Sequence, residues 1–177
     1  LYANGTRTVR GLEALALSRR GAMLSFQGAS GQGLVDLTKA HDIYEKLGLV
    51  TWYHQAQLEI AAAFRRMGLY TEALTTLHRL DKHFVKNHNG FGAARMSEQL
   101  ALVYLDTGRY QEAQQELERS LAFFHQPEYR IEHADRQVML SEALLGQGRT
   151  EEAGRLLGQA ARVLSPQVDL ILHAHLE

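Results

Sequence analysis

Histidine is the side chain in this sequence best suited to bind a metal or transfer a proton, and the chain has nine of them. His78, His83 and His88 lie five residues apart. On a helix each would be rotated by roughly 140° from the last, so the three cannot meet at one ion. His173 and His175 are two residues apart, which also differs from the one-face spacing of a helical zinc pair. We interpret the histidines as solvated surface residues and predict no metal site.

Carboxylates offer the next possible chemistry. Glu112 and Glu116 would share one helical face, a spacing that fits a catalytic acid–base pair as well as an exposed helix. No apolar segment that could frame a pocket surrounds them. Glu112 and Glu152 fall at the start of predicted helices, where acidic side chains complement the helix dipole. We therefore interpret these glutamates as surface residues.

Glycine and nucleophile patterns do not indicate a catalytic site either. Gly31 and Gly33 lie near Gly28, but a dinucleotide-binding fingerprint needs a preceding strand, and a helix is predicted there instead. Nothing in the spacing brings a serine and a histidine together. The absence of cysteine excludes a cysteine nucleophile, a thiolate zinc site and a disulfide framework. We predict that the chain is not an enzyme and binds no cofactor.

Composition places these residues in a helical protein. The 177 residues are 45% apolar and 22% charged, with only two prolines, Pro127 and Pro166. No segment has the length of apolar sequence that a membrane helix needs, and no signal peptide is visible. The expected location is cytoplasmic, with no membrane partner. Because the chain opens at Leu1 and not at Met, we expect a fragment of a longer multidomain protein.

Charge is distributed unevenly. Residues 1–95 carry 12 Lys and Arg against 7 Asp and Glu, whereas residues 96–177 carry 7 against 13. Such an asymmetry affects association more than fold and is too mild to predict direct nucleic-acid binding. It predicts a weak head-to-tail self-attraction that fades as salt rises.

A 40-residue repeat is the most informative feature of the sequence. Gly28, Gly68, Gly108 and Gly148 are 40 residues apart. Around each glycine the same residue sizes recur. A small residue stands seven positions before the glycine and another five positions after it. A bulky residue stands four positions before it, and others stand nine and sixteen positions after it. The small columns are Gly21, Ala61, Ala101, Ser141 and Gly33, Ala73, Ala113, Ala153. The bulky columns are Leu24, Phe64, Tyr104, Leu144; Leu37, Leu77, Leu117, Leu157; and Tyr44, Phe84, Phe124, Leu164.

These offsets predict pairs of antiparallel helices. Steps of three and four residues define one helical face, and glycine in the left-handed conformation ends the first helix of each pair. The predicted pairs are 9–27 with 33–47, 52–67 with 70–86, 92–107 with 110–125, and 130–147 with 150–164. Segment 168–176 reads as the start of a further first helix, and segment 1–8 as the end of a preceding element.

The size columns predict how the helices pack. Small residues mark the closest approach of paired helices, and bulky residues fill the spaces beside them. We interpret Tyr44, Phe84 and Phe124 as core. Trp52 and Tyr53 are predicted to pack the first pair on the second, with an exposed anchor for a partner as the alternative.

Segments 60–80, "IAAAFRRMGLYTEALTTLHRL", and 100–121, "LALVYLDTGRYQEAQQELERSL", closely resemble the tetratricopeptide repeat. Segments 140–161 and 20–41 resemble it less closely. The resemblance implies an all-α fold, a right-handed superhelical stack of four antiparallel helix pairs. It implies one domain over residues 1–177, with repeats at about 14–47, 54–87, 94–127 and 134–166. The chain departs from the family pattern in its period of 40 and in the polar residues Gln57, Ser97 and Gln137 early in the first helices.

The resemblance also implies a function. Similar long repeats occur in bacterial regulatory proteins, so we expect a protein- or peptide-binding scaffold, a regulatory module of a larger signalling or transcription-regulating protein. The alternative is a dimerisation or oligomerisation module that controls a linked output domain. The expected partner is a protein or peptide, with a homo-oligomer possible under the alternative.

First helices line the concave side of a tetratricopeptide superhelix, so the resemblance places the binding residues there. The predicted binding residues are Leu58, Ala62, Arg65, Arg66, Arg95, Glu98, Leu102, Leu105 and Asp106. Equivalent positions in the outer repeats are Ser18, Ala22, Ser25, Val138, Glu142 and Leu145. The family's carboxylate clamp for chaperone tails is incomplete, because its positions carry Ser18, Ala22, Glu59, Arg95 and Gln99. We expect Arg65, Arg66 and Arg95 to hold acidic groups of a peptide while Leu58 and Leu102 supply apolar contact.

Overall fold

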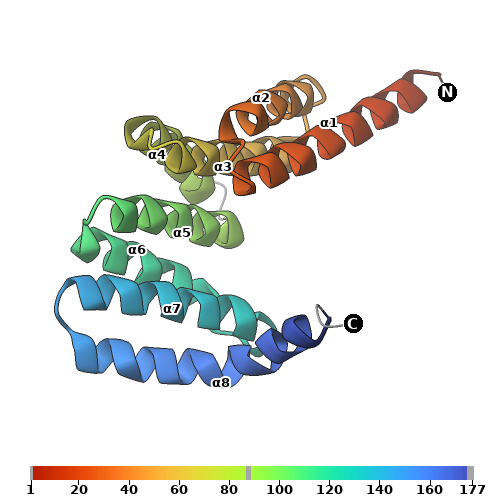
Figure 1. Cartoon of the computed structure of the whole chain (residues 1–177). Helices are drawn as coiled ribbons and strands as arrows, with labels where there is room; N and C mark the ends of the chain where they lie inside the picture. The colour runs from red at the N-terminus through yellow and green to blue at the C-terminus, as the bar shows by residue number, and fades with distance from the viewer. Residues whose placement is uncertain (1, 87–88, 175–177) are drawn as a thin grey trace. The chain divides into compact units, whose positions relative to one another are not determined.

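The computed structural model describes residues 2–86 and 89–174, and this part of the chain is helical apart from short turns. It contains eight α-helices and one short 3-10 helix, η1, and no strand among the described residues (Figure 1). The helices are α1 Tyr2–Phe26, α2 Ser30–Lys46, α3 Val50–Arg66, α4 Tyr70–Lys86, α5 Gly90–Asp106, α6 Tyr110–Phe123, η1 Pro127–Tyr129, α7 Arg130–Gly146 and α8 Thr150–Ala174. None of the described helices has the length and hydropathy to cross a bilayer.

A glycine in the left-handed conformation ends the first helix of every pair, as predicted. Gly28, Gly68, Gly108 and Gly148 have φ between 70° and 88°. The residue after each glycine donates its N–H to the carbonyl of the bulky residue that stands four positions before that glycine. Leu69, for example, donates to Phe64 at 2.9 Å. This arrangement is the Schellman motif, which satisfies carbonyls left open at a helix end. Gly48 makes a fifth such turn, between α2 and α3, that the 40-residue pattern did not include.

The described residues form two compact units, Leu1–His83 and Phe84–Glu177. In the first unit, α2 packs against α1 and α3. In the second unit, α6 packs against α5 and α7, and α7 packs against α8 (Figure 1). Thus α2 and α6 each lie between two first helices of their own unit, which is the packing unit of a helical repeat.

Small and large residues occupy the predicted places in the core. Ala73, Ala113 and Ala153 have no exposed surface. Gly21 and Gly33 occupy the two columns of small residues in the first repeat. A Cβ added at either position would overlap the backbone of the facing helix. The aromatic column Tyr44, Phe84 and Phe124 is buried, which confirms its assignment to the core.

Trp52 packs on α2 and stays partly exposed; that it anchors a partner stays a prediction. Its ring lies 6.0 Å from that of Tyr44, while nearly half of the residue stays exposed. Leu49 and Tyr53 pack beside the core residues Tyr44 and Ala56. The apolar run therefore packs α3 on α2, as predicted.

The structure corrects several helix limits. α1 begins at Tyr2, so segment 2–8 belongs to this helix and not to a preceding element, and α2 begins at Ser30 instead of 33. α8 continues through Pro166 to Ala174, so residues 168–174 do not start a new helix; residues 175 and 176 of that prediction lie outside the described part. A proline removes one backbone hydrogen bond, which a long helix can lose without ending there.

Leu157 is 39% exposed, unlike the fully buried Leu37, Leu77 and Leu117 of its column.

Candidate protein-binding surface

In the first unit, the predicted surface is formed by α1 and α3. Arg66 lies at the C-terminal end of α3, with its guanidinium carbon 5.1 Å from the centre of the Phe26 ring on α1. Burial and the neighbouring charge of Arg65 both lower the pKa of Arg66, while Glu59 opposes them. The positive charges of Arg65 and Arg66 repel each other in this position. An anionic partner would offset that repulsion, so the pair favours an anionic partner.

Three predicted apolar contacts are not available to a partner. Leu58, Ala62 and Leu105 are buried in the structure. The prediction that Leu58 supplies an apolar contact to a peptide is therefore wrong, because its side chain already packs inside the protein. The repeat pattern placed these residues on the correct helices, but burial of each depends on what covers its helix.

In the second unit, α5 and α7 lie side by side. On α5, Arg95 and Leu102 are half-buried and Asp106 is exposed. On α7, Val138 and Leu145 are 40% and 49% exposed. These two side chains are seven residues apart, or two helical turns, so they project from one face of the helix.

Glu98 has a different role from the predicted one. Its carboxylate accepts a hydrogen bond from the guanidinium of Arg136 on α7, forming a largely buried ion pair. Glu98 was expected to face a peptide beside Arg95, and instead it ties α5 to α7. The Glu98 carboxylate is therefore already paired with a positive charge within the protein.

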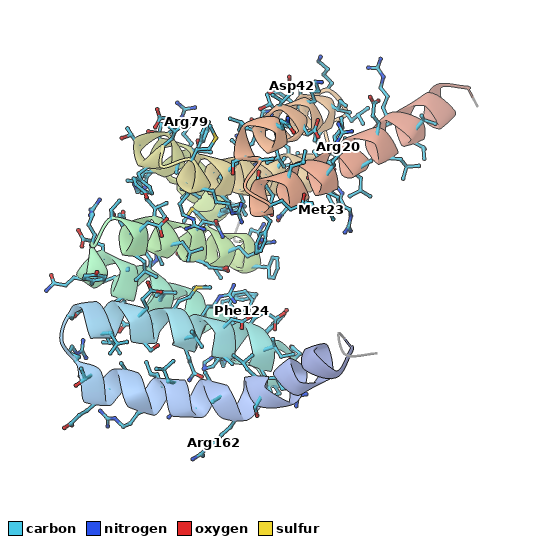
Figure 2. All side chains as sticks on the ribbon, viewed as in Figure 1. Arg20, Met23, Asp42, Arg79, Phe124 and Arg162 are labelled. Carbon is cyan, nitrogen blue, oxygen red and sulfur yellow. The ribbon has the colours of Figure 1, made fainter. Side chains whose placement is uncertain are left out.

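Arg136 is the centre of a polar network that the repeat columns did not predict. Its Nε donates to Ser120 Oγ at 2.9 Å, and one terminal nitrogen donates to the Glu132 carbonyl at 2.8 Å. The guanidinium also stacks on the Phe124 ring at 3.9 Å. Figure 2 labels Phe124. Ser120 in turn donates to the Ala94 carbonyl at 2.8 Å, so the network joins α5, α6 and α7.

Burial is the main cause that lowers the pKa of Arg136, and Glu98 opposes it by attraction. Arg95 lowers that pKa further, so its positive charge acts on the same cluster. Arg95 is half-buried on α5, the helix that Glu98 ties to α7. That it shares one surface with Arg65 and Arg66 stays a prediction.

One sequence signal pointed to Arg136. Twelve residues before the repeat glycine stand Ala16, Ala56 and Met96 in the other repeats, and only the fourth repeat has a charged residue there. A charge in a column of apolar residues indicates a buried partner. No group of three or more histidines and carboxylates among the described residues is placed to hold a metal ion.

The tetratricopeptide repeat family matches residues 52–124. This segment consists of tetratricopeptide repeats. Repeats of this family generally act as protein-interaction scaffolds and are typically not catalytic. No curated protein matches the sequence of this chain.

Two solved structures show the same tetratricopeptide-like fold at low sequence identity. BtubC (BKLC) from P. vanneervenii has a TM-score of 0.72 at 15% identity, over 87% of this chain and 64% of that one. The chain thus spans under two thirds of BtubC. The nearly identical TPR-like repeats of a Podosopora anserina protein assigned as a kinesin light chain have a TM-score of 0.65 at 21% identity, covering 85% of this chain and 74% of that one. Both likenesses concern the fold.

Within the tetratricopeptide repeats, α5 is the first helix of a matched repeat, and α7 follows the matched segment in the same helical register. Their shared surface combines exposed apolar side chains on α7 with charged residues at its edge. This surface is therefore the candidate protein-binding surface of the second unit.

Proposed function

We propose that this chain is a protein-binding scaffold whose second unit binds an amphipathic segment of a partner across α5 and α7. The observation that carries the proposal is the pair Val138 and Leu145, both substantially exposed on one face of α7. Isolated exposed apolar residues are ordinary, but two at a spacing of two turns beside a neighbouring helix form a contact line.

The charges around this line select the partner. Glu142 is exposed between Val138 and Leu145 on α7, and Asp106 is exposed at the end of α5. Residues 84–177 carry 9 Lys and Arg against 13 Asp and Glu. A helix or extended segment with an apolar stripe and flanking basic residues complements this surface, because opposite charges steer association and set orientation.

The ion pair between Arg136 and Glu98 supports a binding role. By joining α5 to α7 it keeps the two helices in one arrangement before a partner arrives. A surface that is already ordered loses less conformational entropy on binding. Binding of this kind suits a regulatory module of a larger signalling or transcription-regulating protein, the role that the family resemblance implies.

The test uses peptides of about 16 residues selected by display on the whole chain. The best binder is labelled, and its affinity is measured by fluorescence anisotropy. We expect Leu145→Glu to weaken binding by about tenfold or more, because a charge replaces a central apolar contact. Its melting temperature should change little, since Leu145 is half exposed.

The double variant Arg65→Ala with Arg66→Ala is the matched comparison, because it removes the candidate surface of the first unit. It should bind the peptide like the unaltered chain. Loss of affinity in the arginine variant, with normal affinity in Leu145→Glu, would instead place the binding surface on the first unit and favour an acidic peptide.

A further inference from the structure

A surface pocket lies at the turn between α2 and α3, within the first unit. Its volume is about 310 Å³, the room of about ten water molecules at about 30 Å³ each. It is lined by the rings of Tyr44, Tyr53 and His54 and by the aliphatic side chains of Leu49 and Val50. Both helices of the pocket lie inside the sequence, between α1 and α4. Aromatic and aliphatic walls around a space of this volume are typical of a ligand site.

The aromatic walls of the pocket are held in place by packing. The Tyr53 ring lies 4.3 Å from the His41 ring and meets the His54 ring edge-on at 5.2 Å, measured between ring centres. Tyr44 is 2% exposed, and its ring stacks on that of Trp52 at 6.0 Å. Rings that already have a fixed position lose little conformational entropy when a ligand binds. The pocket is therefore formed before a ligand arrives.

The second unit places one of its own aromatic rings at the equivalent position. Eighty residues after Tyr44 and Leu49 stand Phe124 and Tyr129. The Tyr129 ring lies 5.3 Å from the Phe124 ring, at an angle of 87°, and 5.7 Å from the ring of Phe123. Edge-to-face contact of this kind is favourable for two aromatic rings. Beside Tyr44 the first unit thus has a pocket, whereas beside Phe124 the second unit has an aromatic side chain.

The two turns differ in their backbone because their sequences differ. α2 continues to Lys46, and Gly48, with a φ of 65°, then turns the chain directly into α3. α6 ends earlier in the repeat, at Phe123, and the 3-10 helix η1 then brings in Tyr129. The tight glycine turn of the first unit leaves only the aliphatic Leu49 at the position of Tyr129. An aromatic ring in this pocket therefore has to come from another polypeptide.

The charges at the rim favour a neutral ring with a hydroxyl group over a cation. Glu45 lines the pocket, is exposed and offers carboxylate oxygens to a hydrogen-bond donor. The guanidinium of Arg7 already donates to the Leu47 carbonyl at the end of α2, at 2.8 Å, and Lys46 adds a positive charge in the last turn of this helix. Both would repel a cationic ligand. A phenol hydroxyl donates to a carboxylate without bringing a charge of its own.

We propose that this pocket binds a tyrosine side chain of a partner polypeptide. The ring packs beside Tyr44 as Tyr129 packs on Phe124, and the hydroxyl donates a hydrogen bond to Glu45. A tyrosine in this position anchors a partner because it buries a large apolar ring and keeps its polar end paired at the rim. The pocket belongs to the first unit and is separate from the surface of α5 and α7, so either site can bind without the other.

NMR titration of the whole nitrogen-15-labelled chain with N-acetyl-tyrosinamide tests the proposal. We expect saturable shifts of the amide resonances of Gly48, Leu49 and Val50, with a Kd of about 1 mM for a ligand of this size. N-acetyl-phenylalaninamide lacks the hydroxyl and should bind about threefold to tenfold more weakly, the loss of one hydrogen bond. N-acetyl-argininamide and N-acetyl-leucinamide should cause no saturable shift at the same concentrations.

Leu49→Tyr places a ring of the chain itself in the pocket, as Tyr129 does in the second unit. It should abolish binding of N-acetyl-tyrosinamide while the chain stays as helical as before. Leu69→Tyr is the matched control, because Leu69 also follows a left-handed glycine, Gly68, but lies outside the pocket. It should bind as the unaltered chain does. Glu45→Ala keeps the pocket open and should bind N-acetyl-tyrosinamide and N-acetyl-phenylalaninamide equally.

Preferential binding of N-acetyl-argininamide would overturn the proposal, because the pocket would then be a site for a cation. Unchanged binding in a fully helical Leu49→Tyr variant would place the ligand elsewhere and overturn it too. Tighter binding of free tyrosine than of N-acetyl-tyrosinamide would mean that the ligand is the amino acid itself and not a polypeptide. An unaltered chain with no saturable shift up to about 20 mM N-acetyl-tyrosinamide would equally contradict the proposed site.

Discussion

At the scale of single residues, Asp36 is the clearest case of a charge held by the fold. It is 5% exposed on α2, and its carboxylate accepts two hydrogen bonds from Arg20 of α1, at 2.6 and 2.8 Å. Figure 2 labels Arg20 on α1. The Arg20 hydrogen bonds are the main cause that lowers the pKa of Asp36, against the opposing effect of burial. A planar guanidinium can bind both carboxylate oxygens at once, which favours the ionised form of Asp36.

This lowered pKa predicts a pH-dependent stability. Because the folded-state pKa lies below the unfolded value, the pair stabilises the protein above the unfolded pKa, about 3.9 for aspartate, and the gain is lost as pH falls through the folded pKa. We expect Asp36→Asn to lower the melting temperature at pH 7, and the difference from the unaltered chain to shrink below about pH 4. Glu45→Gln, an exposed position on the same helix, is the control. A difference that stayed constant down to pH 3 would mean that Asp36 contributes by packing alone.

At the scale of helices, the network of Arg136 holds three elements of the second unit together. Its guanidinium has partners on α5 and α6 as well as on its own helix, and its side chain is 6% exposed. Taking such a charge out of water is costly, and the cost is offset only while the partners are in place. The network therefore ties the position of α7 to that of α5.

Removing one partner of this ion pair should destabilise the second unit more than removing both. Glu98→Ala leaves the Arg136 guanidinium buried without its carboxylate partner. We expect the free energy of unfolding to fall by about 3 kcal/mol. This is the lower end of the range for buried pairs, because Glu98 is partly exposed. The double variant Glu98→Leu with Arg136→Met replaces the pair by apolar groups and should recover much of that loss. Urea unfolding of both variants measures the difference. A double variant as unstable as Glu98→Ala would show that packing, and not the uncompensated charge, sets the cost.

At the scale of the whole molecule, the uneven charge of the chain predicts a weak association of one copy with another. Residues 1–83 carry 10 Lys and Arg against 7 Asp and Glu, and residues 84–177 carry 9 against 13. Attraction between opposite net charges is screened by salt, whereas burial of apolar surface is not. These forces have different salt dependences, so they can be separated by measurement.

We expect the association constant to fall as sodium chloride rises from about 0.05 to 0.5 M, because the Debye length shortens from about 10 Å at 0.1 M towards about 3 Å at 1 M. An association constant that rose with salt would instead point to an apolar interface between copies. Sedimentation equilibrium at several salt concentrations measures this. Complete loss at high salt would show that charge alone drives association.

The sequence by itself determined the elements and their core. The recurring glycine marks each left-handed turn, and the columns of small and bulky residues mark the buried face, because both depend on residues within one or two helical turns. Ala113 and Phe124 could therefore be assigned to the core from residue spacing alone. The same reasoning failed at the last repeat, where Leu157 matches its column but is not covered.

Only the tertiary structure decided which faces remain available to a partner. Leu58 and Ala62 are buried, Glu98 is paired with Arg136, and Val138 and Leu145 stay exposed, although repeat position alone predicts the same face for all of them. Exposure depends on which distant helix covers a face, and a pattern of spacings within one helix carries no information on that neighbour.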